Sequence, residues 1–433
     1  MKPSKSPTVA IHTHGCKLNQ ADSQELARQF QEAGFSLTKS STQADIVVLN
    51  SCTVTANSDS KARKYLRRAR RANPNALVVA TGCYAERAGD DLSDMEAVSL
   101  VLDNRNKQHL VATVAAKLNI APVAVTSVTT PTETSMSLEL LRTRAMVKIQ
   151  EGCDQVCAYC IVPKVRGRER SIPPEEIIAE VNARATTGRR EVVLTGTQLG
   201  TYGFDLPATN LRELIQQVLA ETTVDRLRIS SLQAQEITPE LLDLWQDSRL
   251  CPHFHIPLQS GSDSVLRSMR RRYDTAQVAE TVQLVRSRIP DAGITTDIIV
   301  GFPREGAREF AESYSFAESM DFSDIHVFPY SIRPGTSAAY VGGQVANGIK
   351  KERNGEMLEL AATKMREFRL GSLKQVRPVL WNMNRTKEPF GGWSGLTDNY
   401  LQVRTQHTDN LANTITSVRL TGLDGDWVTS EII

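Results

Sequence analysis

The chain has 433 residues, more than one ordinary domain holds, so we expect several domains with separate hydrophobic cores. Hydrophobic residues make up 40% of the chain, and no uninterrupted apolar run approaches the roughly 18 residues that span a bilayer, which argues against a membrane protein. The net charge of +2 excludes a strongly basic or acidic chain, and the N-terminus lacks the apolar segment of a secretory signal, so we expect a cytoplasmic protein.

Residues 7–120 predict an open α/β sheet domain. Its apolar runs are typical of buried parallel strands and lie at residues 8–13, 44–50, 76–81 and 97–103. Between them, residues 19–34 and 57–72 have helical spacing. The sequence therefore alternates strands and helices, as a parallel sheet requires.

A cysteine follows each of the first three predicted strands: Cys16, Cys52 and Cys83. Because the carboxyl ends of parallel strands meet at one edge of a sheet, we predict that these three thiols form a shared metal site. His12 and His14 lie nearby, but alternation along the strand favours a structural role for both.

The second predicted helix carries seven basic residues and no acid between positions 61 and 71. They are Lys61, Arg63, Lys64, Arg67, Arg68, Arg70 and Arg71. Two further basic runs lie at 166–170 and 267–272. One such run is as well explained by a solvated helix face, but three in one chain favour a polyanionic partner.

Residues 121–138 are rich in Thr, Ser and Pro and predict a linker. The next segment, 139–370, repeats an apolar run and a helical pattern, and its six candidate strands lie near residues 145–152, 191–197, 226–232, 253–259, 293–301 and 324–331. Six such repeats predict a partial (β/α)6 barrel with its chemistry at the carboxyl ends of the strands. His253 and His255 share one strand face, where we expect them to line the barrel, and Cys251 precedes that strand, where a buried inert thiol is expected.

Residues 371–433 contain short β-like runs separated by Gly, Asn and Asp turns, which predicts a small antiparallel β-barrel. Six basic and six acidic residues lie between positions 374 and 431, so charge alone does not mark this domain as RNA-binding.

The stretch CDQVCAYC places Cys153, Cys157 and Cys160 in the loop after the first barrel strand. A structural zinc site normally has four ligands in paired knuckles, which this spacing lacks. Thiolates are the usual ligands of iron–sulfur clusters, and a 4Fe-4S cluster held by three of them keeps one iron free for another ligand.

The CxxxCxxC spacing, with an aromatic residue before its last cysteine, resembles that of the radical S-adenosylmethionine enzymes. With the three N-terminal cysteines and the small C-terminal barrel, the whole chain resembles the methylthiotransferases of that superfamily. The matching stretches are GCKLNQADS, NSCTVT, TGCYAER, EGCDQVCAYCIVPKVRGRERS, PLQSGSDSVLRSMRRRY, TDIIVGFP and YSIRPGT.

The resemblance implies two 4Fe-4S clusters, one on each cysteine set, and S-adenosylmethionine as cofactors. It also implies a C-terminal TRAM domain that binds RNA, a tRNA anticodon stem-loop as partner, no membrane partner, and an external electron donor and sulfur donor. The barrel cluster would generate a 5′-deoxyadenosyl radical that abstracts hydrogen from the adenine next to the anticodon, and a methylthio group would replace that hydrogen.

Three substrates occur in the family: threonylcarbamoyladenosine in tRNA, isopentenyladenosine in tRNA, and an aspartate of a ribosomal protein. The stretches RLRISSLQAQEI, LCPHFHIPLQSGSD and DIHVFPYSIRPGT are most similar to the threonylcarbamoyladenosine branch. A protein of another class, a non-catalytic iron–sulfur carrier or RNA-binding protein, would need no open iron and would be expected to have four ligands per cluster.

Five residues at strand ends or in the cysteine motif are candidate contacts for S-adenosylmethionine: Tyr159, Gly196, Ser230, Ser231 and Gln259. Tyr159 would stack on the adenine or bond to it, and Gly196 would allow close approach, although a core aromatic and a turn glycine are the alternatives. The serines and Gln259 would bind the ribose or the carboxylate. The chain departs from the family at Arg304, where glycine is usual, and at 195–198, where Thr-Gly-Thr-Gln replaces Gly-Gly-Glu.

Overall fold

The computed structural model describes residues 6–120, 143–384, 386 and 391–433. The predicted linker, 121–138, lies outside these residues. The chain divides into two compact units. Unit 1 comprises the N-terminal residues to Arg142 with Gly152–Asp154 and Cys160–Arg168, and unit 2 comprises the remainder. The three cysteines of the CxxxCxxC motif are therefore shared, with Cys157 in unit 2.

Unit 1 contains the predicted open α/β sheet. Its five parallel strands follow the order β2 (Ser36–Leu37), β1 (Thr8–His14), β3 (Ile46–Ser51), β4 (Leu77–Gly82) and β5 (Leu100–Leu102). The short β2 was not predicted. The helices are α1 (Lys17–Glu32), α2 (Ala56–Ala72), α3 (Cys83–Arg87), α4 (Gly89–Ser93), α5 (Leu110–Lys117) and α6 (Val162–Arg166).

Both faces of this sheet are covered, which explains the uninterrupted apolar character of its central strand β3. Ile46 and Val48 contribute to a core formed with α1 and α5. Leu49, on the opposite face, packs with Ala62 and Leu66 of α2. All six residues of β3 are buried. The strand ends are thereby held in fixed positions at one edge of the sheet.

The main part of unit 2 is the predicted partial barrel. Its six parallel strands are β6 (Arg144–Lys148), β9 (Glu191–Thr195), β10 (Arg226–Ile229), β11 (His253–His255), β12 (Gly293–Val300) and β13 (Asp324–Pro329). They form two three-stranded sheets. Isolated parallel bridges, Leu227 to Leu250 and Ser231 to His255, link the segment of β10 to that of β11. A short antiparallel pair, β7 (Gln150–Glu151) and β8 (Arg170–Ser171), follows the first strand.

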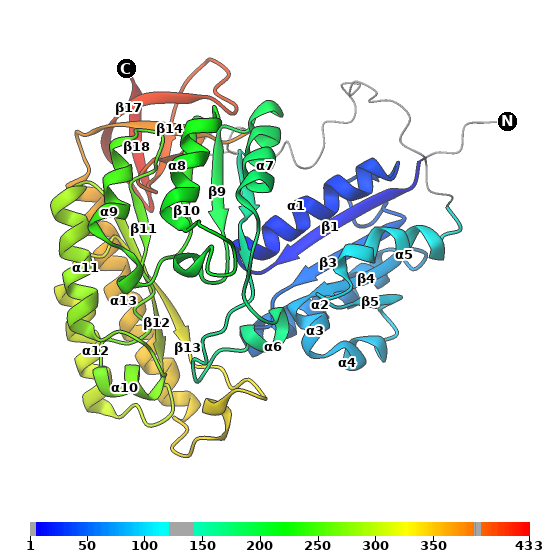
Figure 1. Ribbon diagram of the computed structural model, residues 1–433, viewed down its shortest axis with the longest axis horizontal. Helices are drawn as coiled ribbons and strands as arrows, with labels where there is room; N and C mark the ends of the chain where they lie inside the picture. Colours follow the sequence, from blue (N-terminus) through cyan, green and yellow to red (C-terminus); the bar gives the residue numbers. More distant parts are fainter. Residues whose placement is uncertain (1–5, 121–142, 385, 387–390) are drawn as a thin grey trace. The chain divides into compact units, whose positions relative to one another are not determined.

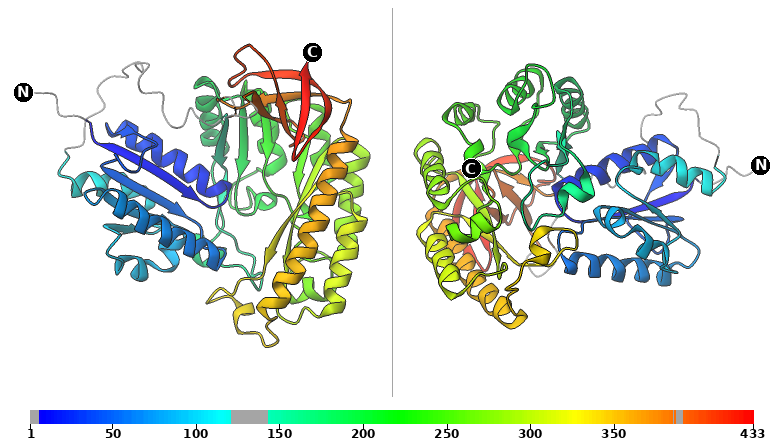
Figure 2. Two further views of the ribbon diagram at one scale, coloured as in Figure 1. Left: turned by 180° about the vertical axis from the view of Figure 1, so that it is seen from behind. Right: turned by 60° about the horizontal axis from the view of Figure 1, so that its bottom comes forward.

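The barrel helices lie outside the strands (Figure 2). They are α7 (Pro174–Thr186), α8 (Leu211–Glu221), α9 (Pro239–Leu242), α10 (Asp263–Ser268), α11 (Thr275–Arg288), α12 (Ala307–Ser319) and α13 (Asn347–Gly371). Ile294, Ile298 and Ile325 belong to the core that these helices cover. Side chains at the alternate strand positions therefore face the barrel interior. As predicted, these include the buried His253 and His255.

The C-terminal domain is a closed barrel of five strands, β14 (Val376–Trp381), β15 (Trp393–Thr397), β16 (Gln402–Thr405), β17 (Ile415–Asp424) and β18 (Trp427–Ile432). The predicted barrel is confirmed, but not its wholly antiparallel pairing, because β16 and β18 run parallel.

This small barrel adjoins the amino ends of the large barrel's strands (Figure 1). Arg226, the first residue of β10, donates to the carbonyl oxygens of Leu396 and Thr397 at 3.1 and 2.8 Å. Cys251 is 1% exposed at this same end, where the sequence placed it, and burial raises the pKa of its thiol. Within the ranges the structure describes, no helix combines the length and apolarity needed to cross a membrane.

Candidate active site

The three N-terminal cysteines lie where the strands of unit 1 end. Cys16 is the N-cap of α1, Cys52 directly follows β3, and Cys83 is the first residue of α3. None of the three forms a disulfide. Burial, and then the neighbouring thiols of Cys16 and Cys83, raise the pKa of Cys52 to about 12. The predicted convergence of the three thiols is therefore present within one unit.

Two glycines that precede these cysteines permit the close approach of the strand ends. A Cβ on Gly15 would lie 2.8 Å from the Cβ of Cys52. Gly82 has a φ of +93°, and a Cβ there would collide with Asn50 and with the backbone of Ser51. A side chain at either position would push the cysteine loops apart, which explains the Gly-Cys pairs in the sequence.

Hydrogen-bond donors and a cation surround the thiols. The backbone N–H of Val54 donates to Cys52 Sγ at 3.4 Å, and the Asn104 side-chain amide donates to Cys83 Sγ at 3.7 Å. Arg166, buried on α6, lowers the pKa of Cys52 against the effect of burial. These donors and this positive charge oppose the effect of burial, and they are groups that would stabilise thiolates in a cluster-bound state.

Arg166 is held in place by Asp22 of α1, a residue of the GCKLNQADS stretch. The Arg166 guanidinium lies 3.2 Å from Asp22 Oδ2, which also accepts from Lys107 at 2.9 Å. The side chains of Arg166 and Asp22 are 3% and 2% exposed. Sequence analysis assigned Arg166 to a basic run suited to a polyanion, but this burial makes it unavailable for that role.

The basic residues of α2 divide into two classes. Lys61, Lys64, Arg67, Arg68 and Arg71 are exposed. Arg63 donates to the Tyr84 hydroxyl at 2.7 Å. Arg70 donates to the carbonyl oxygens of Pro74 and Ala76 and to Ser99. Its guanidinium therefore connects the last turn of α2 to the segments that follow the helix. Five of the seven predicted phosphate-binding residues are therefore exposed, whereas Arg63 and Arg70 are partly buried and bonded to other parts of the domain.

In unit 2, Cys157 lies beside Arg271, a residue that sequence analysis placed in an exposed basic run. Arg271 Nη1 donates to Cys157 Sγ at 3.3 Å and to the Tyr159 hydroxyl at 3.5 Å, and Nη2 donates to Gln233 Oε1 at 3.1 Å. The neighbouring Arg267, Arg270 and Arg272 are exposed. A cation bonded to the thiol supports the assignment of Cys157 as a thiolate ligand.

A chain of amides and one carboxyl group continues from Gln233 along the strand ends. Gln233 donates to Gln198 Oε1 at 2.5 Å, and Gln198 in turn bonds to Glu236. Burial raises the pKa of Glu236 to about 7, although hydrogen bonds from Gln233 and the charge of Arg271 oppose this shift. Gln198, which lies in the segment 195–198 that departs from the family pattern, therefore bonds to both Gln233 and Glu236.

The other predicted cofactor contacts, Gly196, Ser230, Ser231 and Gln259, differ in their burial and in their hydrogen bonds. Gly196 is adjacent to Gln150, whose Oε1 a Cβ would approach to 3.0 Å, so a steric reason for glycine exists at this position. Ser230 is buried, and within the described residues its hydroxyl has no hydrogen-bond partner. Ser231 forms an isolated backbone β-bridge with His255. Gln259 has a left-handed backbone, with φ 70°, and its backbone forms hydrogen bonds with Asp297 and Ile299. The buried free hydroxyl fits a cofactor contact best.

Two known families match parts of the chain. Residues 8–103 match "Uncharacterized protein family UPF0004", and residues 147–317 match "Radical SAM superfamily". The first range contains Cys16, Cys52 and Cys83, and the second contains the CxxxCxxC motif.

Similar proteins cover nearly the whole chain. Threonylcarbamoyladenosine tRNA methylthiotransferase MtaB of Bacillus subtilis is 34% identical, with 95% of this chain and 93% of the relative aligned. The protein of the same name from Aquifex aeolicus is 36% identical over 92% of this chain and 96% of its own length. The tRNA-2-methylthio-N(6)-dimethylallyladenosine synthase of Methylacidiphilum infernorum is 34% identical over 82% of this chain and 79% of its own.

Among solved structures, the radical S-adenosylmethionine methyltransferase TsrM from Kitasatospora setae has a TM-score of 0.56 at 13% identity, covering 77% of this chain and 75% of that one. The likeness supports the fold. Barrel, cysteine motif and superfamily match together define a radical S-adenosylmethionine enzyme. With the N-terminal domain and the full-length relatives, the chain belongs to the radical S-adenosylmethionine methylthiotransferase family.

Several site residues were not identified from sequence. They are Asn104, Arg166, Gln233, Glu236 and Arg271. Their residue types are common, and each acquires its role through a contact to a distant part of the chain, so spacing gives no signal for them.

Proposed function

We propose that this enzyme converts threonylcarbamoyladenosine in tRNA to its 2-methylthio derivative. The observation that carries the proposal is the full-length similarity to relatives named for that reaction, combined with two sets of three free cysteines. Its cofactors are S-adenosylmethionine and two 4Fe-4S clusters. We assign one cluster to Cys16, Cys52 and Cys83 and the other to Cys153, Cys157 and Cys160.

When bound, these groups supply a 5′-deoxyadenosyl radical and the sulfur that joins the substrate carbon. The chain's own residues hold and surround them. The positively charged guanidinium of Arg271 lies beside Cys157 Sγ, and that of Arg166 lies near Cys52. The Ser230 hydroxyl, which has no partner among the described residues, would bond to the ribose or the carboxylate of the cofactor. The ring of Tyr159 would stack on the adenine. An abstraction of hydrogen from a C–H bond needs no acid–base pair, in agreement with a site dominated by amides.

The tRNA partner is expected to contact the exposed cations of α2, with the C-terminal barrel adding shape and polar contacts. An electron donor and a sulfur donor complete the reaction, and both are expected from other proteins or small molecules of the cytoplasm.

Isopentenyladenosine is the second candidate substrate, because the relative from Methylacidiphilum infernorum, named for a dimethylallyladenosine product, covers 82% of this chain. An aspartate of a ribosomal protein and a non-catalytic carrier are the remaining alternatives. Mass spectrometry of tRNA nucleosides from a strain lacking the gene separates them. We expect the 2-methylthio form of threonylcarbamoyladenosine to disappear while its precursor accumulates, and loss of methylthio-isopentenyladenosine instead would refute the substrate.

The cluster assignment is tested by iron content after anaerobic reconstitution. We expect about eight irons per chain, falling to about four when either cysteine set is changed to Ala, and unchanged in Cys251→Ala. The variant lacking Cys16, Cys52 and Cys83 should still produce 5′-deoxyadenosine from S-adenosylmethionine but not methylthiolate tRNA. Four irons in the unaltered enzyme would disprove the two-cluster assignment.

A further inference from the structure

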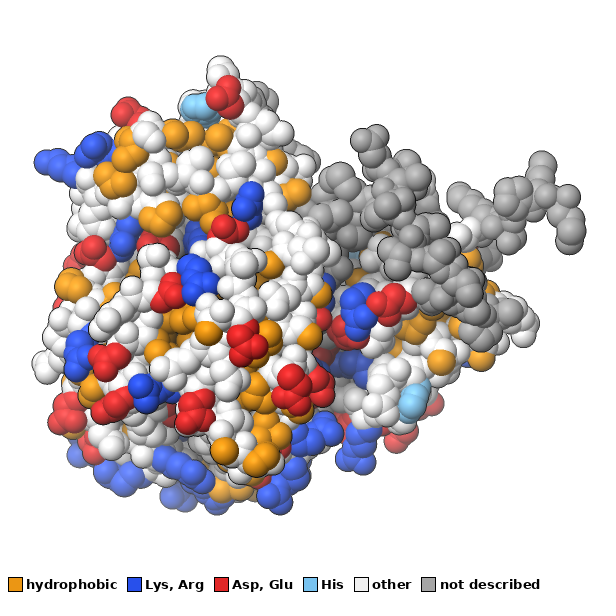
Figure 3. Space-filling view, turned by 45° about the horizontal axis from the view of Figure 1, so that its top comes forward, with side chains coloured by type: hydrophobic (Ala, Val, Ile, Leu, Met, Phe, Trp, Pro, Cys, Tyr) orange, Lys and Arg blue, Asp and Glu red, His pale blue; other side chains and the backbone are white. Residues whose placement is uncertain are grey.

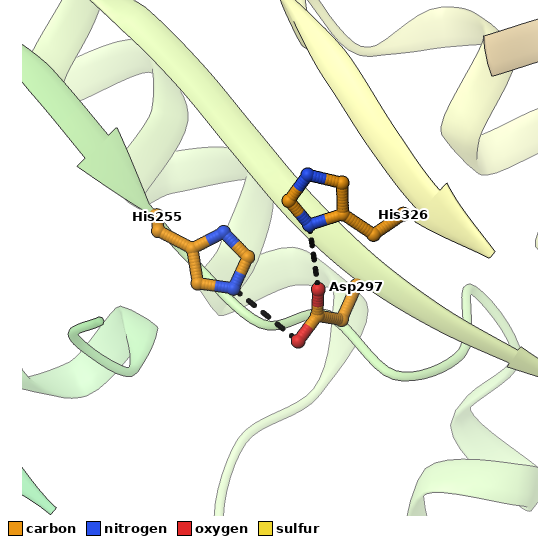
Figure 4. A group of neighbouring side chains, drawn as sticks. All are labelled: His255, Asp297 and His326. Atoms are coloured by element: carbon orange, nitrogen blue, oxygen red, sulfur yellow. Dashed lines mark hydrogen bonds and ion pairs between the residues drawn. The ribbon is translucent and has the colours of Figure 1, made fainter. Parts of the chain in front are cut away.

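His255, Asp297 and His326 form a compact group on three adjacent strands of the large barrel (Figure 4). His255 ends β11, Asp297 lies in β12, and His326 lies directly opposite Asp297 in β13. Their candidate ligand atoms all lie within 4.8 Å of one another. The sequence predicted that His255 lines the barrel, which is confirmed, but gave no reason to group it with the other two.

The distances within the group are those of a ligand set. Asp297 Oδ2 lies 3.3 Å from His255 Nε2, and Asp297 Oδ1 lies 3.0 Å from His326 Nδ1. Metal–ligand bonds of about 2.1 Å place two ligands at most about 4.2 Å apart, so both pairs already have suitable spacing. The candidate ligand nitrogens of the two imidazoles lie within 4.8 Å of each other, close to that limit.

The second nitrogen of each imidazole faces an outer partner. His255 Nδ1 lies 2.9 Å from Thr295 Oγ1, and His326 Nε2 lies 3.6 Å from Asp324 Oδ2. Histidines that bind metals commonly use the other ring nitrogen in this way, which fixes the ring orientation. Each imidazole therefore has one nitrogen beside Asp297 and the other beside a second residue, Thr295 for His255 and Asp324 for His326.

The group is accessible from the barrel interior and not from the helix layer. Ile294, Ile298 and Ile325, which alternate with Asp297 and His326 along the same strands, belong to the apolar core beneath the helices. Exposure of the side chains increases from 10% for His255 through 26% for Asp297 to 45% for His326. A bound ion would have its open coordination positions on the interior side.

We propose that His255, Asp297 and His326 bind one divalent transition-metal ion whose open positions take an oxygen ligand of the substrate. Two histidines and one carboxylate form a set that binds such ions and leaves other positions free. This inference rests on the proposed function: a threonylcarbamoyl group carries a carboxylate and a hydroxyl, whereas an isopentenyl group offers neither. The ion would thereby select the substrate.

Zinc is the probe, because iron would be confused with cluster iron. The full chain, with both clusters loaded so that its six cysteines are occupied, is mixed with Zn²⁺, desalted, and analysed for zinc and iron by mass spectrometry. We expect about one zinc per chain in the unaltered enzyme and at least a tenfold lower zinc content in His326→Gln and in Asp297→Asn. His326→Gln is the milder change, since this side chain is nearly half exposed.

His407→Gln is the matched control, because His407 also faces a carboxylate, Asp409 at 4.0 Å, but on the C-terminal barrel. Its zinc content should equal that of the unaltered enzyme. Iron content and circular dichroism show that each variant is folded. Equal zinc in the unaltered enzyme and His326→Gln, or equal loss in His407→Gln, would overturn the metal site.

The substrate part is measured with free nucleosides. Threonylcarbamoyladenosine should bind the zinc-loaded enzyme at least tenfold more tightly than the zinc-free enzyme, while isopentenyladenosine should show no difference. Equal binding of threonylcarbamoyladenosine in both forms would refute the selecting role. A zinc site with a different tRNA product in the deletion strain would instead refute the proposed function and leave the ion, so the two failures can be distinguished.

Discussion

Arg304 has a left-handed backbone, with φ 68°, at the position where the family usually has glycine. Its backbone N–H donates to the carbonyl oxygen of Gly343 at 2.8 Å, which holds this conformation. A residue with a Cβ is strained in this region by about 1–2 kcal/mol, whereas glycine is not. The departure noticed in the sequence is therefore a local cost in stability.

We expect Arg304→Gly to raise the free energy of unfolding by up to about 1 kcal/mol, because relief of strain exceeds the larger chain entropy of glycine. Denaturant unfolding of the two proteins measures this difference. Arg304→Ala keeps the Cβ and should bring no gain. A Gly variant less stable than the Ala variant would show that the larger chain entropy of glycine outweighs the strain that it relieves.

Glu236 predicts a pH dependence of stability. Its pKa in the folded enzyme is about 7, above the usual value of about 4.3, because burial disfavours the carboxylate. Between those two pH values the folded state holds a proton that the unfolded state has released. The stabilisation is therefore complete below about pH 4.3 and is lost as pH rises through about 7.

Glu236→Gln removes this titration while keeping an oxygen acceptor for the Gln233 backbone. Thermal unfolding followed from about pH 5 to about pH 8 should show a smaller decline in stability for this variant than for the unaltered enzyme. Glu318→Gln, at an exposed site on α12, is the control and should reproduce the unaltered profile. Parallel profiles for all three proteins would mean that Glu236 ionises normally.

Helix α2 is the element with the clearest expected role in binding tRNA. On the face shown in Figure 3, acidic and basic side chains alternate over the middle of the surface and Lys and Arg gather along its lower edge, while the C-terminal domain is balanced in charge. In contrast, α2 has five exposed cations and, in its first turn, the buried Asp59 paired with Arg87. Phosphate affinity depends on released counterions and therefore on the number of such cations.

Replacing Lys64, Arg67, Arg68 and Arg71 by Gln should reduce the slope of log affinity against log salt by up to about three to four units if all four contact phosphates. Fluorescence anisotropy with labelled tRNA over a salt series gives the slope. Arg70→Gln is the matched control. It should lower stability, because Arg70 bonds to three groups after the helix, but leave the slope unchanged. An unchanged slope in the fourfold variant would assign the run to a solvated helix face.

The elements themselves were predictable, since burial on both faces makes β3 an uninterrupted apolar run and the Cys residues follow such runs. The roles of single residues within the basic runs were not. Arg70 depends on Ser99, and Arg271 on Cys157, partners that lie 29 and 114 residues away. The pairing of Asp297 with His326 likewise depends on the register of two parallel strands, which periodicity does not fix.

At the scale of the whole molecule, the C-terminal barrel is fixed to the large barrel by the loop between β15 and β16. Tyr400 stacks on His253 with ring centroids 4.2 Å apart, and the guanidinium of Arg228 lies 5.0 Å from the Tyr400 ring. Arg228 also donates to the carbonyl oxygen of Asp398 at 2.9 Å. Arg228 and Glu191 are fully buried partners beneath this loop, 2.8 Å apart.

This attachment changes what removal of the C-terminal domain would test. Deleting residues 373–433 would expose buried charges at the end of the barrel, so weaker tRNA binding after deletion would report lost stability as well as a lost RNA contact. Point substitutions in α2 and in the exposed surface of the small barrel separate the two effects. The small barrel is thus a structural part of the enzyme in addition to its expected RNA-binding role.

Tyr400→Ala should therefore destabilise both barrels together. The change removes the ring between His253 and Arg228 and should lower the free energy of unfolding by about 2–4 kcal/mol, as expected for loss of a packed aromatic side chain. Tyr340→Ala is the control, because Tyr340 is 77% exposed and its loss should change stability by at most about 0.5 kcal/mol. Denaturant unfolding gives the free energies, and limited proteolysis shows whether the C-terminal domain becomes separable. If Tyr400→Ala were as stable as Tyr340→Ala, the stacked loop would not hold the two barrels together.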